Sequence, residues 1–159
     1  MIYAATGHRP HLLPCGNDAN HQWITSLKKR LIDWFEETTY LDKDVKIISG
    51  MATGWDMWVA DIALQFNVPV HAYIPFPGQE SQWSNQDIQH YNRILDKVAD
   101  IKLCSDKYHP KAYFKRDKMM VDGANKIIAL LDPNQKKGGT FYTVNYASKT
   151  GKEIKNFWE

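Results

Sequence analysis

The sequence contains very few cysteines. Cys15 and Cys104 are the only two among 159 residues, and they lie far apart and form no CxxC pair. This pattern predicts neither a disulfide framework nor a zinc site, and it indicates reduced thiols. A chain of this length buries enough apolar surface to fold without such cross-links.

The sequence also lacks an excess of charge of either sign. The formal net charge is +2, and the basic residues are scattered along the chain. A dedicated duplex-DNA-binding protein carries instead a dense stripe of Lys and Arg. Net charge therefore gives no support to nucleic acid as a partner, and we do not expect one.

Long hydrophobic runs, internal repeats and low-complexity segments are absent. No apolar run approaches the roughly 20 residues that span a bilayer, and the apolar stretch at residues 1–5 has no basic region of a signal peptide. The composition, 43% hydrophobic and 24% charged, is ordinary for a soluble globular protein. We therefore expect a cytoplasmic protein with no membrane contact, folded as one domain over residues 1–159.

Short apolar runs alternate with longer segments of helical periodicity, and Gly, Ser, Pro or Asp separates them. This alternation is typical of α/β proteins. Several runs lack polar alternation, which indicates strands covered by helices on both faces. We predict a single Rossmann-like α/β domain with a mainly parallel central sheet and helices on both faces. The predicted strands are residues 2–5, 45–48, 68–74, 101–103, 126–131 and 153–157.

Apolar residues at helical spacing predict five helices. Asn20 is the expected N-cap of the first, and Thr53 followed by Asp56 resembles a capping arrangement for the second. Trp83, in a loop over residues 75–84, fits two roles, stacking on a base or folding back over apolar surface. The helices are expected within residues 23–35, 55–64, 88–98, 112–121 and 141–149.

Three strand-to-helix turns have sequences suited to binding an anion. In an open parallel sheet, ligands bind beyond the carboxyl ends of the strands, where helix N-termini present free N–H groups. The first turn is Thr6-Gly7-His8-Arg9-Pro10, where the glycine permits close backbone approach and the arginine can hold a phosphate bidentately. The simpler alternative is a turn with a solvated arginine.

The other two turns are rich in glycine and hydroxyl groups. Residues 49–56, SGMATGWD, can bring backbone amides and hydroxyls onto an anion, or can form a tight turn in which Thr53 and Asp56 only cap the helix. Residues 136–143, KKGGTFYT, add two lysines, and Thr140 can cap the helix or bond an anion. A glycine hinge in an exposed loop is the alternative there.

No residue pattern predicts a metal or a nucleophilic centre. His8 and His11 form an HxxH pair, but no nearby carboxylate or cysteine completes a ligand set, and Pro10 argues against both lying on one helix. We therefore expect no bound metal. No Ser/His/Asp or Cys/His spacing identifies a nucleophilic site.

Several motifs occur in a fixed order along most of the chain. The segments are TGHRP at residues 6–10, SGMAxGxD at 49–56, AYIPF at 72–76, Tyr113-x-x-Arg116 followed by MVD at 120–122, and GGT at 138–140 followed by Thr143, Tyr146-Ala147 and Gly151-Lys152. Together they resemble the SMF/DprA–LOG superfamily of Rossmann-like nucleotide-binding proteins, and in particular its YpsA-like branch, often found in bacteria and their phages. The ordered set is far more specific than any single glycine turn.

The resemblance implies a nucleotide or phosphoribosyl pocket shared by the turns at Ser49 and Gly138, with Arg9 and Arg116 as anion partners. It implies no cofactor beyond the nucleotide or nucleotide-derived ligand, and it leaves a homo-oligomer open. The ligand-binding residues expected on this basis are Thr6, Gly7, His8, Arg9, Ser49, Gly50, Met51, Thr53, Gly54, Asp56, Pro75, Arg116, Gly138, Gly139, Thr140 and Thr143.

The resemblance does not select a reaction. The LOG enzymes of this superfamily cleave nucleoside monophosphates and carry a GGxGTxxE motif, whose glutamate position holds Thr143 in this sequence. The obvious carboxylate for hydrolysis is therefore missing, and Asp56, Asp117 and Asp122 are the candidate substitutes. We expect a protein that binds, and thereby senses, sequesters or carries, a phosphorylated nucleotide or a nucleotide-derived small molecule. The alternatives are N-glycosidic hydrolysis and, as in the DprA branch, binding of single-stranded DNA.

Overall fold

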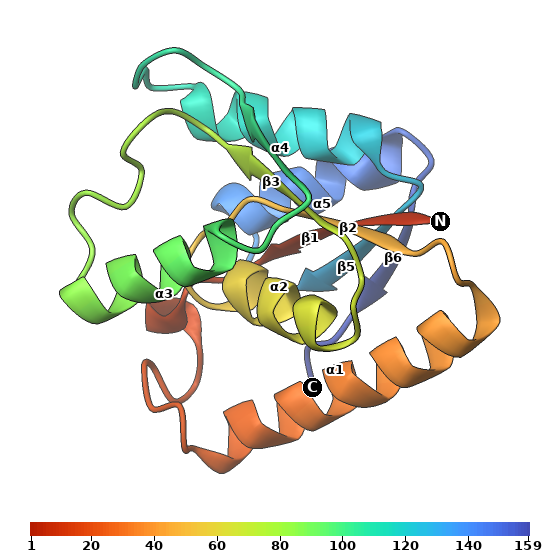
Figure 1. Ribbon diagram of the computed structural model, residues 1–159. Coiled ribbons are helices and arrows are strands. Elements are labelled where there is room, and N and C mark those ends of the chain that lie inside the picture. Colours follow the sequence, from red (N-terminus) through yellow and green to blue (C-terminus); the bar gives the residue numbers. More distant parts are fainter.

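A computed structural model describes residues 1–159 and contains one all-parallel sheet. The strands pair in the order β4-β3-β2-β1-β5-β6 (Figure 1). This arrangement confirms the predicted α/β class and the parallel sheet. The strands are β1 (Ile2–Gly7), β2 (Lys46–Ser49), β3 (Val70–Ile74), β4 (Asp100–Leu103), β5 (Lys126–Leu130) and β6 (Glu153–Asn156).

Helices cover both faces of the sheet, as predicted for strands with continuous apolar runs. The first three helices pack on one face and the last two on the other (Figure 1). No helix is both long enough and apolar enough to cross a membrane. The helices are α1 (Gln22–Leu41), α2 (Trp55–Gln65), α3 (Asn85–Leu95), α4 (Ala112–Gly123) and α5 (Gly139–Lys149), with a short 3-10 turn at Pro10–Leu12.

The larger core lies between the sheet and helices α1 to α3. Leu27, Leu31 and Phe35 repeat at helical spacing along α1 and are fully buried. Trp55, at the start of α2, is also fully buried, and its indole N–H donates to the carbonyl of Ile128 at 3.2 Å. The tryptophan therefore anchors α2 to the β5 strand, next to the ends of β1 and β2.

Two predicted helix caps are wrong. The N-cap of α1 is His21, whose Nδ1 accepts from the amide of Trp23 at 3.1 Å, and Asn20 lies one residue too early. Gly54 precedes α2 with a φ of +88° and caps no amide through a side chain, so Thr53 does not cap this helix. The positive φ favours glycine there, and the chain enters α2 without a hydroxyl cap.

The third helix begins and ends three residues earlier than predicted. The Ser84 hydroxyl accepts from the amide of Asp87 at 3.2 Å, which starts the helix at Asn85. Trp83 packs edge-on against Tyr91 with ring centroids 5.3 Å apart. Of the two roles open for this tryptophan, the structure shows it folded back onto apolar surface.

The order of the strands creates one point where the direction of the chain reverses. From β1 the chain proceeds through β2 and β3 to β4 at one edge, and it then returns to β5 on the other side of β1. The loops that leave β1 and β5 therefore diverge toward opposite faces of the sheet. Such a switch point is where open α/β sheets leave a crevice at the carboxyl ends of their strands.

The close contact between Gly7 and Trp55 generates a stability prediction. A Cβ on Gly7 would lie 2.5 Å from the Cβ of Trp55, which is closer than two carbon atoms pack. We expect Gly7→Ala to lower the free energy of unfolding by about 1–3 kcal/mol through overpacking. The measurement is urea unfolding followed by tryptophan fluorescence.

Gly139 offers a matched control for this substitution. A Cβ on Gly139 meets no atom within 4 Å, so Gly139→Ala should change the free energy of unfolding by less than about 1 kcal/mol. Equal stability of the two variants would contradict the described packing between β1 and α2.

Candidate functional site

A cavity of about 350 Å³ opens at the switch point between the ends of β1 and β5. The loop after β1, the start of α2, one side of α4 and the start of α5 form its walls. It is lined by Ala5, Thr6, Gly7, His8, Arg9, His11, Leu12, Ala52, Asp56, Tyr113, Arg116, Asp117, Lys137, Gly138, Gly139 and Thr140.

The structure brings together just over half of the residues expected to bind ligand. The expected residues on the wall of the cavity are Thr6, Gly7, His8, Arg9, Asp56, Arg116, Gly138, Gly139 and Thr140. The expected residues that do not line it are Ser49, Gly50, Met51, Thr53, Gly54, Pro75 and Thr143. Thr53 and Gly54 instead line a second cavity of about 330 Å³ between α1, α2 and α3.

The turn after β1 is held to the end of β5 through His8. The backbone amide of His8 donates to the carbonyl of Leu130 at 3.1 Å, and its Nε2 accepts from the amide of Asp132 at 3.0 Å. Burial lowers the pKa of His8, against the opposing effect of the Asp132 carboxylate. The imidazole is therefore a neutral acceptor near pH 7. It joins the loop after β1 to the loop after β5.

Arg9 and Lys137 supply uncompensated positive charge at the cavity. Neither residue takes part in any of the ion pairs of the chain. The guanidinium of Arg9 lies 5.5 Å from the ring centroid of Tyr113, a cation–π distance that fixes the side chain against α4. The two cations are consequently available to an anion that enters from solvent.

The first turn of α5 adds backbone donors beside these cations. Gly138 precedes the helix with a φ of +97° and makes no side-chain cap bond, and Thr140 therefore does not act as the cap that its sequence allowed. The first N–H groups of a helix have no acceptor within the helix, and they carry the positive end of its dipole. Because Gly139 has no Cβ, these amides remain open to a ligand in the cavity.

The turn after β2 is stabilised by internal hydrogen bonds. The Ser49 hydroxyl donates to the carbonyl of Asp56 at 2.9 Å and accepts from the amide of Met51 at 3.1 Å. Met51 has a φ of +59°, an uncommon conformation for a residue with a side chain, and it is fully buried. Ser49 and Met51 thus shape the turn, while only Ala52 and Asp56 of this segment reach the cavity.

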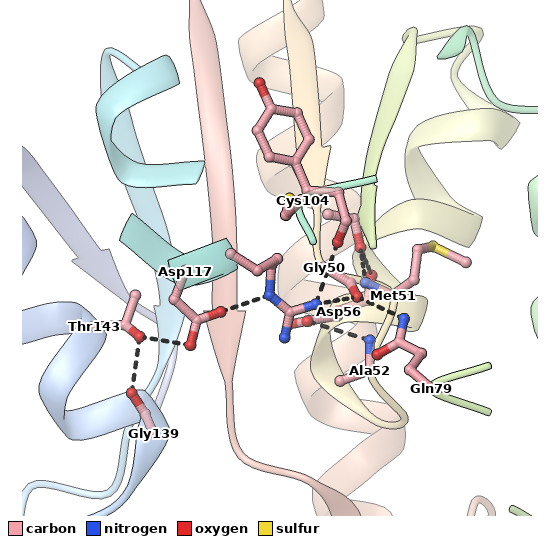
Figure 2. A network of polar contacts seen from close by, with 12 residues as sticks. Gly50, Met51, Ala52, Asp56, Gln79, Cys104, Asp117, Gly139 and Thr143 are labelled. Carbon is pink, nitrogen blue, oxygen red and sulfur yellow. Dashed lines mark hydrogen bonds and ion pairs between the residues drawn. The ribbon is translucent and has the colours of Figure 1, made fainter. Parts of the chain in front are cut away.

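Arg116 is buried and directs two of its three guanidinium nitrogens at the chain itself. Its Nη1 donates to the carbonyls of Gly50 at 2.6 Å and Tyr73 at 3.2 Å, and its Nε donates to Asp117 at 2.7 Å (Figure 2). A Cβ on Gly50 would lie 2.6 Å from Nη1, which explains the glycine. Only Nη2 lacks a partner in the chain, so the predicted anion contact of Arg116 rests on this one nitrogen.

Electrostatics keep this arginine charged despite its burial. Burial by itself lowers the pKa of Arg116, but the carboxylates of Asp117 and Asp56 outweigh that effect, and the pKa is raised. The arginine is therefore a permanent positive charge beneath the cavity, and it joins the ends of β2 and β3 to α4.

Asp56 is the most unusual carboxyl group of the cavity. Its Oδ2 accepts from the amide of Ala52 at 3.4 Å, and its Oδ1 is buried without any partner. Burial raises its pKa to about 7, although the charge of Arg116 acts in the opposite direction. Near neutral pH, Asp56 therefore exists in both its protonated and its ionised form.

Asp117 and Thr143 form a contact between α4 and α5. The Thr143 hydroxyl lies 3.1 Å from Oδ2 of Asp117 and 2.8 Å from the carbonyl of Gly139 (Figure 2). Thr143 is buried behind Asp117 and does not line the cavity, whereas Asp117 does. Asp122, the third candidate acid, accepts from the Tyr146 hydroxyl at 2.7 Å and lies outside the cavity.

Sequence reasoning missed part of the cavity wall. Tyr113 lies one helical turn before Arg116, and this i, i+3 spacing on α4 was the signal that could have placed both at one site. Leu12 and Ala52 gave no chemical signal. No group of three or more His, Cys, Asp or Glu side chains is arranged to hold a metal ion.

Solved structures with the same fold include two of low sequence identity. DNA processing protein A (DprA) from Streptococcus pneumoniae matches with a TM-score of 0.63 and 15% identity over 98% of this chain and 50% of that one. The structural-genomics target TM1055 matches with a TM-score of 0.57 and 12% identity over 97% of this chain and 72% of that one. At these identities the likeness concerns the fold alone.

Similarity in sequence identifies the family. A UPF0398 protein of Shouchella clausii is 27% identical over 87% of this chain and 77% of its own length. A UPF0398 protein of Halalkalibacterium halodurans is 24% identical over 93% of this chain and 80% of its own length. The model of the YspA SLOG family matches residues 3–157, which is nearly the whole chain and includes every wall of the cavity. The chain belongs to the YspA SLOG family.

Proposed function

We propose that the switch-point cavity binds a phosphorylated nucleotide or a nucleotide-derived small molecule. The observation that carries this proposal is the meeting of two unpaired cations, Arg9 and Lys137, with the open first turn of α5. Backbone amides at a helix N-terminus and a nearby guanidinium form a common phosphate-binding arrangement. The protein would sense, sequester or carry this ligand.

The size and position of the cavity support a small-molecule ligand. A volume of about 350 Å³ lies within the usual range for ligand pockets, roughly 300–1,000 Å³. The cavity also occupies the place where doubly wound sheets bind nucleotides. Single-stranded DNA is the competing proposal, since the solved DprA is named for DNA processing. A compact cavity with three cations supports it less than an extended basic groove would.

N-glycosidic hydrolysis is the competing enzymatic proposal, and the contact of Thr143 bears on it. A threonine hydroxyl cannot replace the carboxylate of a hydrolase, and here it hydrogen-bonds to Asp117. The carboxyl groups that remain in the cavity are Asp56 and Asp117. Asp117 is held as a hydrogen-bond acceptor by Arg116 and Thr143. Because α5 itself carries no carboxylate, binding is the function that we favour.

Removal of one cation at the cavity tests the binding proposal. Arg9→Gln and Lys137→Gln should each weaken binding of a nucleoside monophosphate such as AMP by about 1.5–3 kcal/mol, because each removes a charge-assisted hydrogen bond. The measurement is isothermal titration calorimetry at fixed ionic strength.

Lys136→Gln is the matched control for these substitutions. Lys136 neighbours Lys137 in sequence but does not line the cavity, so its loss should change the affinity by less than about 0.5 kcal/mol. An equal effect of Lys136→Gln and Lys137→Gln would indicate a general charge effect and would contradict a site at this cavity.

The state of Asp56 generates a prediction of pH dependence. The second pKa of a phosphate monoester is about 6, so the ligand is already dianionic above pH 7. The pKa of His8 is lowered, and its charge also stays constant there, whereas Asp56 loses its proton through a pKa of about 7. The new negative charge repels the ligand, and AMP affinity should therefore fall between pH 7 and pH 9.

The fall reaches up to roughly fiftyfold if only the neutral form of Asp56 admits the ligand. An Asp56→Asn variant stays neutral and should keep its affinity over the same interval. Calorimetry of both proteins at several pH values measures the difference. Parallel pH profiles for the parent and the variant would show that Asp56 does not face the bound phosphate.

A further inference from the structure

The cavity contains charge of both signs, at different places on its wall. Arg9, Lys137 and the start of α5 present positive charge, while Asp56 and Asp117 present carboxyl groups. An inorganic phosphate would be attracted by the first set and repelled by an ionised carboxylate. A ligand that fills the whole cavity must therefore bring a hydrogen-bond donor to the acidic side.

Asp117 is fixed in place as an acceptor before any ligand arrives. Arg116 donates to its Oδ1 at 2.7 Å, and the single proton of the Thr143 hydroxyl is shared between Oδ2 at 3.1 Å and the Gly139 carbonyl at 2.8 Å (Figure 2). An ionised carboxylate offers about four acceptor positions, and these contacts occupy two of them. The side chain keeps 18% of its surface exposed, and it lines the cavity. The remaining lone pairs are thus available to a ligand.

The distance of this acceptor from the first turn of α5 limits which part of a nucleotide it meets. The Thr143 hydroxyl lies 2.8 Å from the carbonyl of Gly139 and 3.1 Å from Asp117. The Asp117 carboxylate and the Gly139 carbonyl therefore both lie within hydrogen-bond distance of one hydroxyl, which places Asp117 beside the helix start that would hold the phosphate. In a 5′-phosphorylated nucleoside the sugar hydroxyls lie close to the phosphate, whereas the amino groups of the base lie beyond the sugar.

We propose, on the basis of the proposed phosphate site, that Asp117 accepts hydrogen bonds from ribose hydroxyls and makes the cavity selective for ribose over deoxyribose ligands. Thr143 is a positioning residue, because it holds the carboxylate without lining the cavity itself. The ligand class is a 5′-phosphorylated ribose derivative with a free vicinal diol.

Three small probes separate this inference from the proposed function. Inorganic phosphate reports on the cationic side alone, and ribose 5-phosphate and 2-deoxyribose 5-phosphate differ by one hydroxyl group. We expect calorimetry of the parent protein to show about tenfold or greater preference for ribose 5-phosphate over its 2-deoxy analogue, since a hydrogen bond to a charged group is lost.

Variants at the two residues assign the preference. Asp117→Asn and Thr143→Val should each reduce it to less than about threefold, while Thr143→Ser restores it because the hydroxyl returns. Asp122→Asn is the matched control, since this carboxylate also lies on α4 but outside the cavity, and it should retain the full preference. If Asp117→Asn does not fold, the comparison of Thr143→Val with Thr143→Ser tests the same role.

Each outcome decides one of the two proposals. If none of the three probes binds, the phosphate site itself is wrong, and the inference about ribose falls with it. If the parent binds both sugar phosphates equally well, the phosphate site stands and ribose selectivity is wrong. A preference that persists in Asp117→Asn and Thr143→Val overturns the assigned role of the two residues.

Discussion

The buried guanidinium of Arg116 is the interaction on which the geometry of the cavity depends. It joins the turn after β2, the end of β3 and helix α4 through hydrogen bonds to Gly50, Tyr73 and Asp117. A buried charge is tolerated only when it is paired and its hydrogen bonds are made. The glycine at position 50 follows from this constraint, because any side chain there would occupy the space of the guanidinium.

The same charge organises the acidic side of the cavity. Asp117 is oriented by Arg116, and the Thr143 hydroxyl connects it to the first turn of α5. The ionised form of Asp56 is stabilised less, because the desolvation that raises its pKa outweighs the attraction of the arginine. One arginine thus supports one carboxylate that is engaged on both oxygens and another that changes its protonation state near neutral pH.

The sequence predicted the fold well because its strands are short, apolar and separated by clear turn residues. Glycine also marked two turns, because a Cβ on Gly7 would collide with the Trp55 side chain and Gly138 has a φ of +97°. The helix N-caps were harder to predict from the sequence. Thr53 has the hydroxyl of a capping residue, yet Gly54 is the residue that precedes α2, at a positive φ. The capping preference of Thr53 is overridden there, because the chain at Gly54 passes close to His8 and Pro10.

The contacts between distant segments were not predictable from sequence. Arg116 carried the signal of an anion-binding residue, but its partners Gly50 and Tyr73 lie 66 and 43 residues away and both occupy its Nη1. The pairing of Thr143 with Asp117 arises because α4 and α5 pack side by side on one face of the sheet (Figure 1). A one-dimensional pattern shows which groups are present and does not show which of them satisfy one another.

The proposed anion site lies at the start of α5 and the end of β1. Two-dimensional NMR of ¹⁵N-labelled protein during titration with ribose 5-phosphate tests it most directly, since each backbone amide reports on its own surroundings. We expect the largest shifts at the amides of Gly7, Gly139 and Thr140, which line the cavity. Shifts confined to the amides of Thr53 and Gly54, which line the second cavity, or no shifts at all, would contradict it.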